Sequence, residues 1–271
     1  MGLFRQASTH YGNISLNSCE CPALSYFCTT KNEQRKQLNY LLMWLVKSSV
    51  GKKLVMSISG LFLIFFLLFH LSMNVAAVFS TDAYNMICGL LGANWYAVAA
   101  TVVLGGFVVL HFVYATMLTL QNRKARGNDR YAVNTRPAGV SWASQNMFAI
   151  GVVVIGFMCL HLCQFWHKMM FAELAGHHEV ALGGQMVSPQ DGAAFIRYYF
   201  SQPLVVLGYL IWYVALWFHL THGFWSAIHT IGWNNLQWFN RWKCISTIVA
   251  TLICVGFAFV TLFFYAQSLS N

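Results

Sequence analysis

Charged residues are scarce in this sequence, and acidic residues are the scarcest of all. Charged side chains make up 8% of the 271 residues, with 7 Asp and Glu against 16 Lys and Arg, whereas 58% of the residues are hydrophobic. A soluble domain carries about 25% charged residues, so this chain has too few to cover a water-facing surface. The composition therefore excludes an ordinary soluble domain and predicts an integral membrane protein.

Several patterns that carry chemistry are also missing. The sequence has no Gly-rich dinucleotide fingerprint and no Cys run with iron–sulfur spacing. Its 8 Cys do not indicate a disulfide framework, because Cys159, Cys163 and Cys254 lie inside apolar segments, where Cys behaves as a small hydrophobe. The net charge of +9 does not indicate nucleic-acid binding, because most basic residues flank apolar segments.

Five long apolar segments dominate what is present. We expect membrane spans at roughly 54–79, 95–121, 144–171, 203–233 and 245–267, each near or above the length of about 20 residues that crosses a bilayer. Residues 1–42 are polar and lack the apolar core of a signal peptide, so we interpret them as an irregular tail or as sequence upstream of a start at Met43. The predicted fold is an all-α integral membrane protein, with a five-helix domain over residues 43–271.

The connecting loops differ in charge, and this difference predicts the orientation. Basic residues concentrate before the first span, between the second and third, and between the fourth and fifth: Lys47, Lys52, Lys53, Arg123, Lys124, Arg126, Arg130, Arg136, Arg241 and Lys243. Loops rich in Lys and Arg stay on the cytoplasmic side. We therefore expect a cytoplasmic N-terminus and an external C-terminus.

Four of the five spans each carry a histidine in their interior: His70, His111, His161 and His219. A lone membrane histidine is usually an interhelical hydrogen-bond contact, but four on successive spans indicate a shared role. Counted from the expected external ends at about 1.5 Å per residue, His70 and His161 lie about 15 Å deep, and His111 and His219 about 26 Å deep. The histidines therefore sort into two pairs.

Two separate pairs of imidazoles suit two haem groups, each with two axial ligands. A zinc site would need its ligands in one tetrahedron, and a proton relay would need carboxylates among the histidines, which the spans lack. Glycines near the histidines (Gly60, Gly105, Gly106, Gly156 and Gly223) are consistent with flat cofactors between helices, although they also suit close helix packing. A transporter with a histidine-lined path is the alternative from another functional class.

The segments SSVGKK, SISGLFLIFFLLFH, VVLHFVYATM and HLTHGFW resemble a known family. They are similar to the di-haem cytochrome b membrane anchor subunit of succinate:quinone oxidoreductases, in the five-helix, single-polypeptide type found in succinate dehydrogenases and fumarate reductases. The resemblance covers about residues 43 to 267. The anchor of a hydrogenase or a formate dehydrogenase is the alternative within this class, but its histidine spacing matches less well.

The resemblance implies a set of cofactors and ligands. The first four helices would form a bundle that holds two haem b groups. His70 and His161 would bind the distal haem iron, and His111 and His219 the proximal haem iron. His222 lies three residues after His219 on the same helix face; the family pattern of His, Gly and an aromatic residue fits His219, Gly223 and Trp225, so His222 is an alternative ligand or a propionate partner.

The resemblance also implies partners and a location. The chain would lie in the cytoplasmic membrane of a bacterium and bind an iron–sulfur subunit, which in turn binds the flavoprotein that handles the dicarboxylate. A quinone, expected to be menaquinone, would react near the distal haem. Some members carry a glutamate in the fourth helix, but residues 203–233 contain no acid, which leaves Asp82 as the nearest acidic residue to the distal end.

Overall fold

The computed structural model describes residues 22–126, 142–233, 235 and 237–270. The chain divides into two units, with the boundary at Ser48. The first unit contains helix α1 (Pro22–Lys47), and the second, Ser49–Asn271, contains all the expected membrane spans.

Helix α1 differs from the irregular tail that the sequence predicts. That prediction is wrong for residues 22–42, which are helical, while residues 1–21 lie outside the described residues. The segment NEQRKQLNYLL is rich in Glu, Gln, Arg, Lys and Leu, which are strong helix formers. Local propensity therefore forms this helix although it has no sustained apolar face, and from residue 31 to residue 43 its side chains are exposed.

The second unit contains five helices that are long and apolar enough to cross a membrane. They are α2 (Ser49–Phe79), α4 (Trp95–Arg126), α6 (Met147–His161) with its continuation, α9 (Pro203–Thr230) and α10 (Phe239–Ser270). The predicted all-α, five-span membrane fold is confirmed. Helices α2 and α10 begin earlier than predicted because their charged first turns are also helical, although those turns are too polar for the hydrocarbon core.

The third span changes its helical type at the predicted ligand His161. Helix α6 ends at His161, the π-helix η1 (Leu162–Phe171) follows, and α7 (Ala172–Leu174) completes the span. In a π-helix each turn holds more residues than in an α-helix, and such segments often occur at functional sites. The π-helix therefore redirects the side chains that follow His161.

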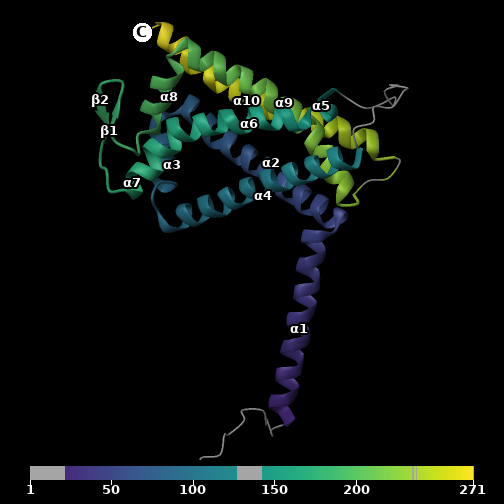
Figure 1. The fold of residues 1–271 in the computed structure, drawn as a ribbon. Coiled ribbons are helices and arrows are strands. Elements are labelled where there is room, and N and C mark those ends of the chain that lie inside the picture. Colours follow the sequence, from purple (N-terminus) through teal and green to yellow (C-terminus); the bar gives the residue numbers. More distant parts are fainter. Residues whose placement is uncertain (1–21, 127–141, 234, 236, 271) are drawn as a thin grey trace, which may run out of the picture. The chain divides into compact units, whose positions relative to one another are not determined.

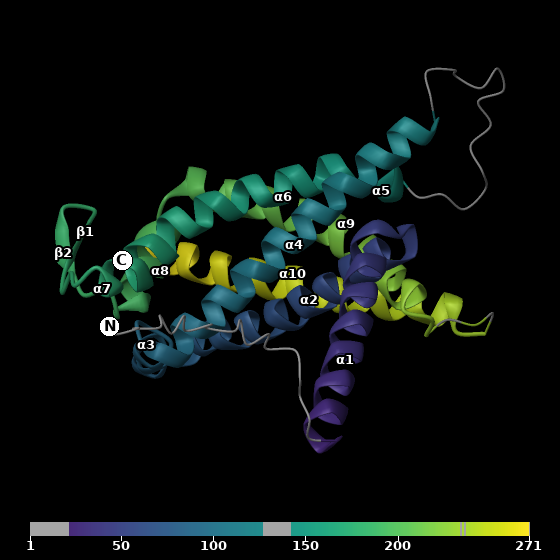
Figure 2. The same cartoon turned by 60° about the horizontal axis from the view of Figure 1, so that its bottom comes forward.

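A small cap closes one end of the second unit (Figures 1 and 2). It consists of α3 (Thr81–Leu90), the antiparallel strands β1 (Val180–Leu182) and β2 (Gln185–Val187), and α8 (Gly192–Phe200), while the short helix α5 (Trp142–Gln145) precedes α6. Asn85 joins the two cap helices: its amide donates to Asp191 Oδ1 at 2.8 Å, and its oxygen accepts from the Ala193 amide at 2.9 Å. Asp191 in turn caps α8 by accepting from the Ala194 amide at 3.1 Å.

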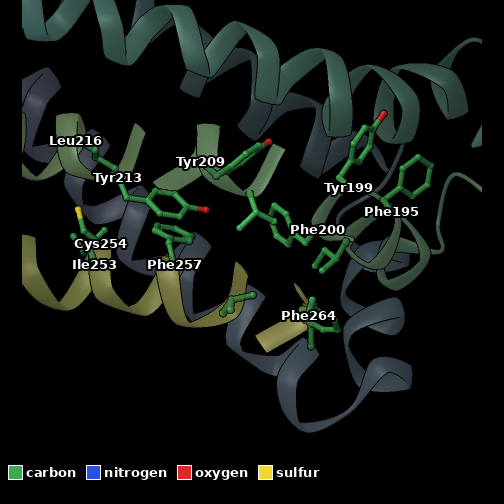
Figure 3. Close-up of a cluster of buried hydrophobic side chains, with 14 of the residues drawn as sticks. Phe195, Tyr199, Phe200, Tyr209, Tyr213, Leu216, Ile253, Cys254, Phe257 and Phe264 are labelled. Carbon is green, nitrogen blue, oxygen red and sulfur yellow. The ribbon is translucent and has the colours of Figure 1, made fainter. Parts of the chain in front are cut away.

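The hydrophobic core lies between α8, α9 and α10 (Figure 3). Tyr213 of α9 stacks on Phe257 of α10, and its hydroxyl bonds the Thr261 hydroxyl at 2.9 Å. In the most apolar stretch of α9, 28% of the residues are buried, and in that of α10, 33% are buried. The corresponding share in the first three spans is only 6–11%. Three of the four histidine-bearing spans are therefore loosely packed within the chain, with side-chain surface left for lipid or cofactor.

Candidate functional site

The four interior histidines meet as two pairs, each formed by two helices. The rings of His70 on α2 and His161 at the end of α6 have centroids 5.9 Å apart and planes at 81°. The rings of His111 on α4 and His219 on α9 have centroids 6.1 Å apart and planes at 68°. The structure thus brings together the same two pairs that depth along the spans predicts.

The two pairs lie at different levels of the bundle. On α2, Ser59 contacts His111 of one pair, and His70 of the other pair lies eleven residues further on, about 16 Å along the helix. On α9, Tyr209 contacts His161 and precedes His219 by ten residues, about 15 Å. Two independent helices therefore give the same separation, which would place one cofactor above the other.

The spacing within each pair fits a metal ion between the rings. An imidazole nitrogen lies about 2 Å from a first-row metal and about 1.1 Å from its own ring centroid, so two axial imidazoles have centroids about 6 Å apart. Two directly hydrogen-bonded imidazoles would have centroids about 5 Å apart. The observed 5.9 Å and 6.1 Å leave room for the first arrangement, and they equal the spacing of ordinary ring contacts such as His161 with Tyr209 at 6.1 Å.

His161 is held by a hydrogen-bonded chain that reaches across to α9. Its Nδ1 lies 3.1 Å from the Tyr209 hydroxyl, and that hydroxyl donates to Gln164 Oε1 at 2.8 Å. Phe165 and Trp212 flank the imidazole with ring centroids 5.1 Å and 5.7 Å away. Gln164 and Phe165 both belong to the π-helix η1, so the change of helical type supplies part of the environment of His161.

His111 is held from α2. Its Nδ1 lies 3.2 Å from the Ser59 hydroxyl, which donates to the Met56 carbonyl at 2.9 Å. Gly60 lies beside the ring, where a Cβ atom would approach His111 Cε1 to 3.2 Å. A side chain at position 60 would therefore crowd the imidazole, which gives this glycine a specific reason to be small.

The neighbouring histidines His219 and His222 contact different partners. His219 faces His111 and lies against Gly151 of α6, whereas the ring of His222 makes an edge contact with Trp225 at 5.2 Å. The Nδ1 atoms of both histidines are buried without a hydrogen-bond partner among the described residues. The geometry favours His219 over His222 as the partner of His111.

His70 connects the site to the cap. The Asn74 amide donates to the His70 carbonyl at 2.8 Å and lies 3.4–3.5 Å from both ring nitrogens, and the Tyr84 hydroxyl of α3 donates to Asn74 Oδ1 at 3.5 Å. Burial raises the pKa of Tyr84 and raises the pKa of the Cys88 thiol to about 11. Both cap groups therefore remain protonated at neutral pH, and Tyr84 keeps the proton that it donates.

The remaining predicted residues take no part in the two pairs. Asp82 is exposed, and so are two further histidines of the spans, His167 and His229; the ring of His167 stacks on Phe171 with centroids 5.3 Å apart. A Cβ atom added at Gly105, Gly106 or Gly156 would meet no other atom within 4 Å, so open space lies beside them, while one at Gly223 would contact Met147. The basic residues Arg130 and Arg136, used to predict the orientation, lie outside the described residues.

Sequence reasoning did not identify Ser59, Tyr209, Gln164 or Gly151 as parts of the site. Each lies within a span, and three of them carry a polar side chain where such groups are rare. The signal was therefore present, but it became specific only when the fold placed each residue beside a histidine or its partner.

Comparisons with protein-family models, with characterised proteins and with solved structures give no match to this chain. Among the residues that the structure describes, no three or more His, Cys, Asp or Glu side chains gather as a metal-binding group. The two histidine pairs are therefore the candidate metal ligands.

Proposed function

We propose that this chain is the di-haem cytochrome b anchor of a succinate:quinone oxidoreductase, either a succinate dehydrogenase or a quinol:fumarate reductase. It would carry electrons between a membrane quinone, expected to be menaquinone, and a cytoplasmic iron–sulfur subunit that binds a flavoprotein. The observation that carries this proposal is the pair of facing imidazoles at each of two levels, with a spacing that fits axial ligation.

The residues of the chain suit this chemistry. A bound haem supplies reversible one-electron iron chemistry, and two histidines fill both axial positions, which favours electron transfer over oxygen binding. His70 with His161 and His111 with His219 would hold the two groups, and the apolar spans would exclude water around them. The Gly60 and Gly151 backbones let the His111 and His219 rings sit close against neighbouring helices.

Lys52 near the start of α2 supports an anionic cofactor. Its side chain is only 7% exposed, and it has no hydrogen bond or ion pair with any residue in the described part of the chain. The ammonium group of Lys52 is a charged hydrogen-bond donor, and a haem propionate is an anion with which such a group can pair. Lys52 lies seven residues before Ser59, which contacts His111, so the propionate would belong to the haem of the His111–His219 pair.

The cap end is the expected side for quinone chemistry, since the resemblance places the quinone near the haem of the His70–His161 pair. Quinone reduction needs protons, and residues 203–233 contain no acidic residue. The Tyr84 hydroxyl holds a proton at Asn74, one hydrogen bond from the His70 backbone. Asp82 lies on the first turn of the same helix and is exposed, so it could exchange protons with water.

The proposal is tested by a reduced-minus-oxidised visible spectrum of the purified chain, with haem counted as the pyridine haemochrome. We expect two b haems per chain and low-spin α bands, because each pair of imidazoles provides two axial nitrogens. A folded preparation from haem-supplied cells that contains no haem would refute the cytochrome function and favour the transporter. Two haems without association with an iron–sulfur subunit would favour another type of anchor.

The angles between the ring planes predict the electron paramagnetic resonance spectrum of the oxidised protein. The ring planes of the two pairs stand at 81° and 68° to each other. If each pair held a haem iron in this orientation, the two imidazoles would interact with different d orbitals and leave them close in energy. We expect two highly anisotropic low-spin signals, with the larger maximal g value from the His70–His161 pair. A bis-imidazole haem with parallel rings is the reference, and rhombic signals like those of that reference would contradict the geometry.

A further inference from the structure

We propose that Tyr209 and Ser59 are positioning residues, each fixing the tautomer of one axial histidine and strengthening it as a haem ligand. This inference rests on the proposed function. Tyr209 and Ser59 are not themselves proposed iron ligands. The proposal predicts that each haem has one axial imidazole whose Nδ1–H is hydrogen-bonded to a hydroxyl and one axial imidazole without such a bond.

The direction of the hydrogen bonds follows from the number of protons that each hydroxyl carries. Tyr209 has one O–H, and with the Gln164 amide oxygen facing it this proton is donated to Gln164 Oε1 at 2.8 Å. In this arrangement the Tyr209 oxygen, 3.1 Å from His161 Nδ1, accepts from His161 Nδ1–H. The same holds at the other pair. Ser59 donates its one proton to the Met56 carbonyl at 2.9 Å, so at 3.2 Å its oxygen accepts from His111 Nδ1–H.

A neutral imidazole that is protonated on Nδ1 has its lone pair on Nε2. Both hydroxyls contact Nδ1, so in His161 and in His111 the nitrogen left for a metal is Nε2. The two hydroxyls therefore select the tautomer whose free nitrogen can bind iron. They also fix the ring orientation, because each bond joins the histidine to a neighbouring helix.

The opposite histidine of each pair lacks this arrangement. Near the ring of His70 lies the Asn74 amide, which is a donor and cannot accept a proton from Nδ1. His219 Nδ1 is buried without a partner among the described residues. Because an accepted N–H raises the basicity of a metal-bound imidazole, His161 and His111 would be the stronger donors of the two pairs.

A stronger axial donor stabilises ferric iron more than ferrous iron and so lowers the reduction potential of the haem. Removing the hydroxyl should therefore raise the potential of one haem and leave the other unchanged. The variants are Tyr209→Phe for the His161 haem and Ser59→Ala for the His111 haem. The rise should be smaller in Ser59→Ala, because the Met56 carbonyl is a second hydrogen-bond partner of His111 and remains in that variant. Gln164→Leu is a milder variant that keeps the Tyr209 hydroxyl but removes its acceptor, and it should raise the same potential as Tyr209→Phe by a smaller amount.

Two matched controls test whether the loss of any buried hydroxyl raises a haem reduction potential. Tyr213→Phe removes a buried hydroxyl one helical turn after Tyr209, where it bonds Thr261 and no histidine. Ser246→Ala removes a fully buried hydroxyl of α10 that donates to the Trp242 carbonyl. Neither control should move either potential.

The measurement is a redox titration of the visible α bands of each purified full-length variant, after its haem content has been counted. The expected result is two haems in every protein, one raised potential in Tyr209→Phe and the other raised potential in Ser59→Ala. If the parent chain binds no haem, the proposed function itself fails. If the parent binds two haems and the potentials do not rise, or rise equally in the controls, the positioning role is overturned while the cytochrome function stands.

Discussion

Replacing His161 with alanine is expected to reduce the haem content from two groups per chain to one. Under the proposed function, His161 would provide one of two nitrogens for its haem, and its partner His70 on α2 could not supply both axial positions. Phe165 and Trp212, which flank the ring, carry no group that binds iron, and the Tyr209 hydroxyl, which is committed to Gln164, is a weaker ligand than the imidazole. The pyridine haemochrome per chain should fall by about half, and the remaining α band should belong to the His111–His219 pair.

His167→Ala is the matched control for this variant. His167 lies on the same span, in the π-helix η1, but it is exposed and stacks on Phe171. This variant should keep both haems and both potentials. Two low-spin haems in His161→Ala would contradict the His70–His161 pair, and a loss of haem in both variants would indicate general damage to the third span.

His219→Ala and His222→Ala are expected to give opposite results. His219 faces His111 with centroids 6.1 Å apart, whereas His222 contacts Trp225 at the same end of α9. The first substitution should therefore remove the haem of the His111–His219 pair, leaving one group per chain. The second should leave two groups, because the ring of His222 does not face His111.

The two variants control for each other, since both remove a partly buried imidazole from one face of α9. Haem content and the visible spectrum of each purified variant provide the comparison. If His222→Ala loses a haem and His219→Ala keeps two, the ligand is His222 and the assignment of this pair is wrong. The His70–His161 haem should be present in both variants and thus reports that the bundle has folded.

Depth along the spans is enough to predict which histidines meet. The rise of an α-helix is constant, so counting from the span ends to His70 and His161 gives nearly equal depths, and the ring contacts follow this order. The same counting could not separate His219 from His222. They are three residues apart on one face, and only the packing of α9 against α2, α6 and α10 determines which ring faces His111.

The supporting hydroxyls could not be predicted, for a physical reason. A Ser or Tyr within a membrane span can bond to its own helix, to another helix or to the interface, and spacing along the chain does not distinguish these cases. Ser59 and Tyr209 became specific only through contacts between different helices. Likewise the π-helix η1 has no signature in an apolar sequence, because hydropathy does not report how backbone hydrogen bonds are paired.

The distribution of the pairs over the chain sets an order for biosynthesis. The chain emerges from the ribosome from its N-terminus. His70 and His161 are therefore both present once the third span has been made, whereas the partner of His111, His219, is made only with the fourth span. Tyr209 and His219 then arrive on the same helix, α9. Insertion of α9 would add the Tyr209 hydroxyl beside His161 and bring His219 to His111. The chain could therefore bind both proposed haems only after α9 has entered the membrane.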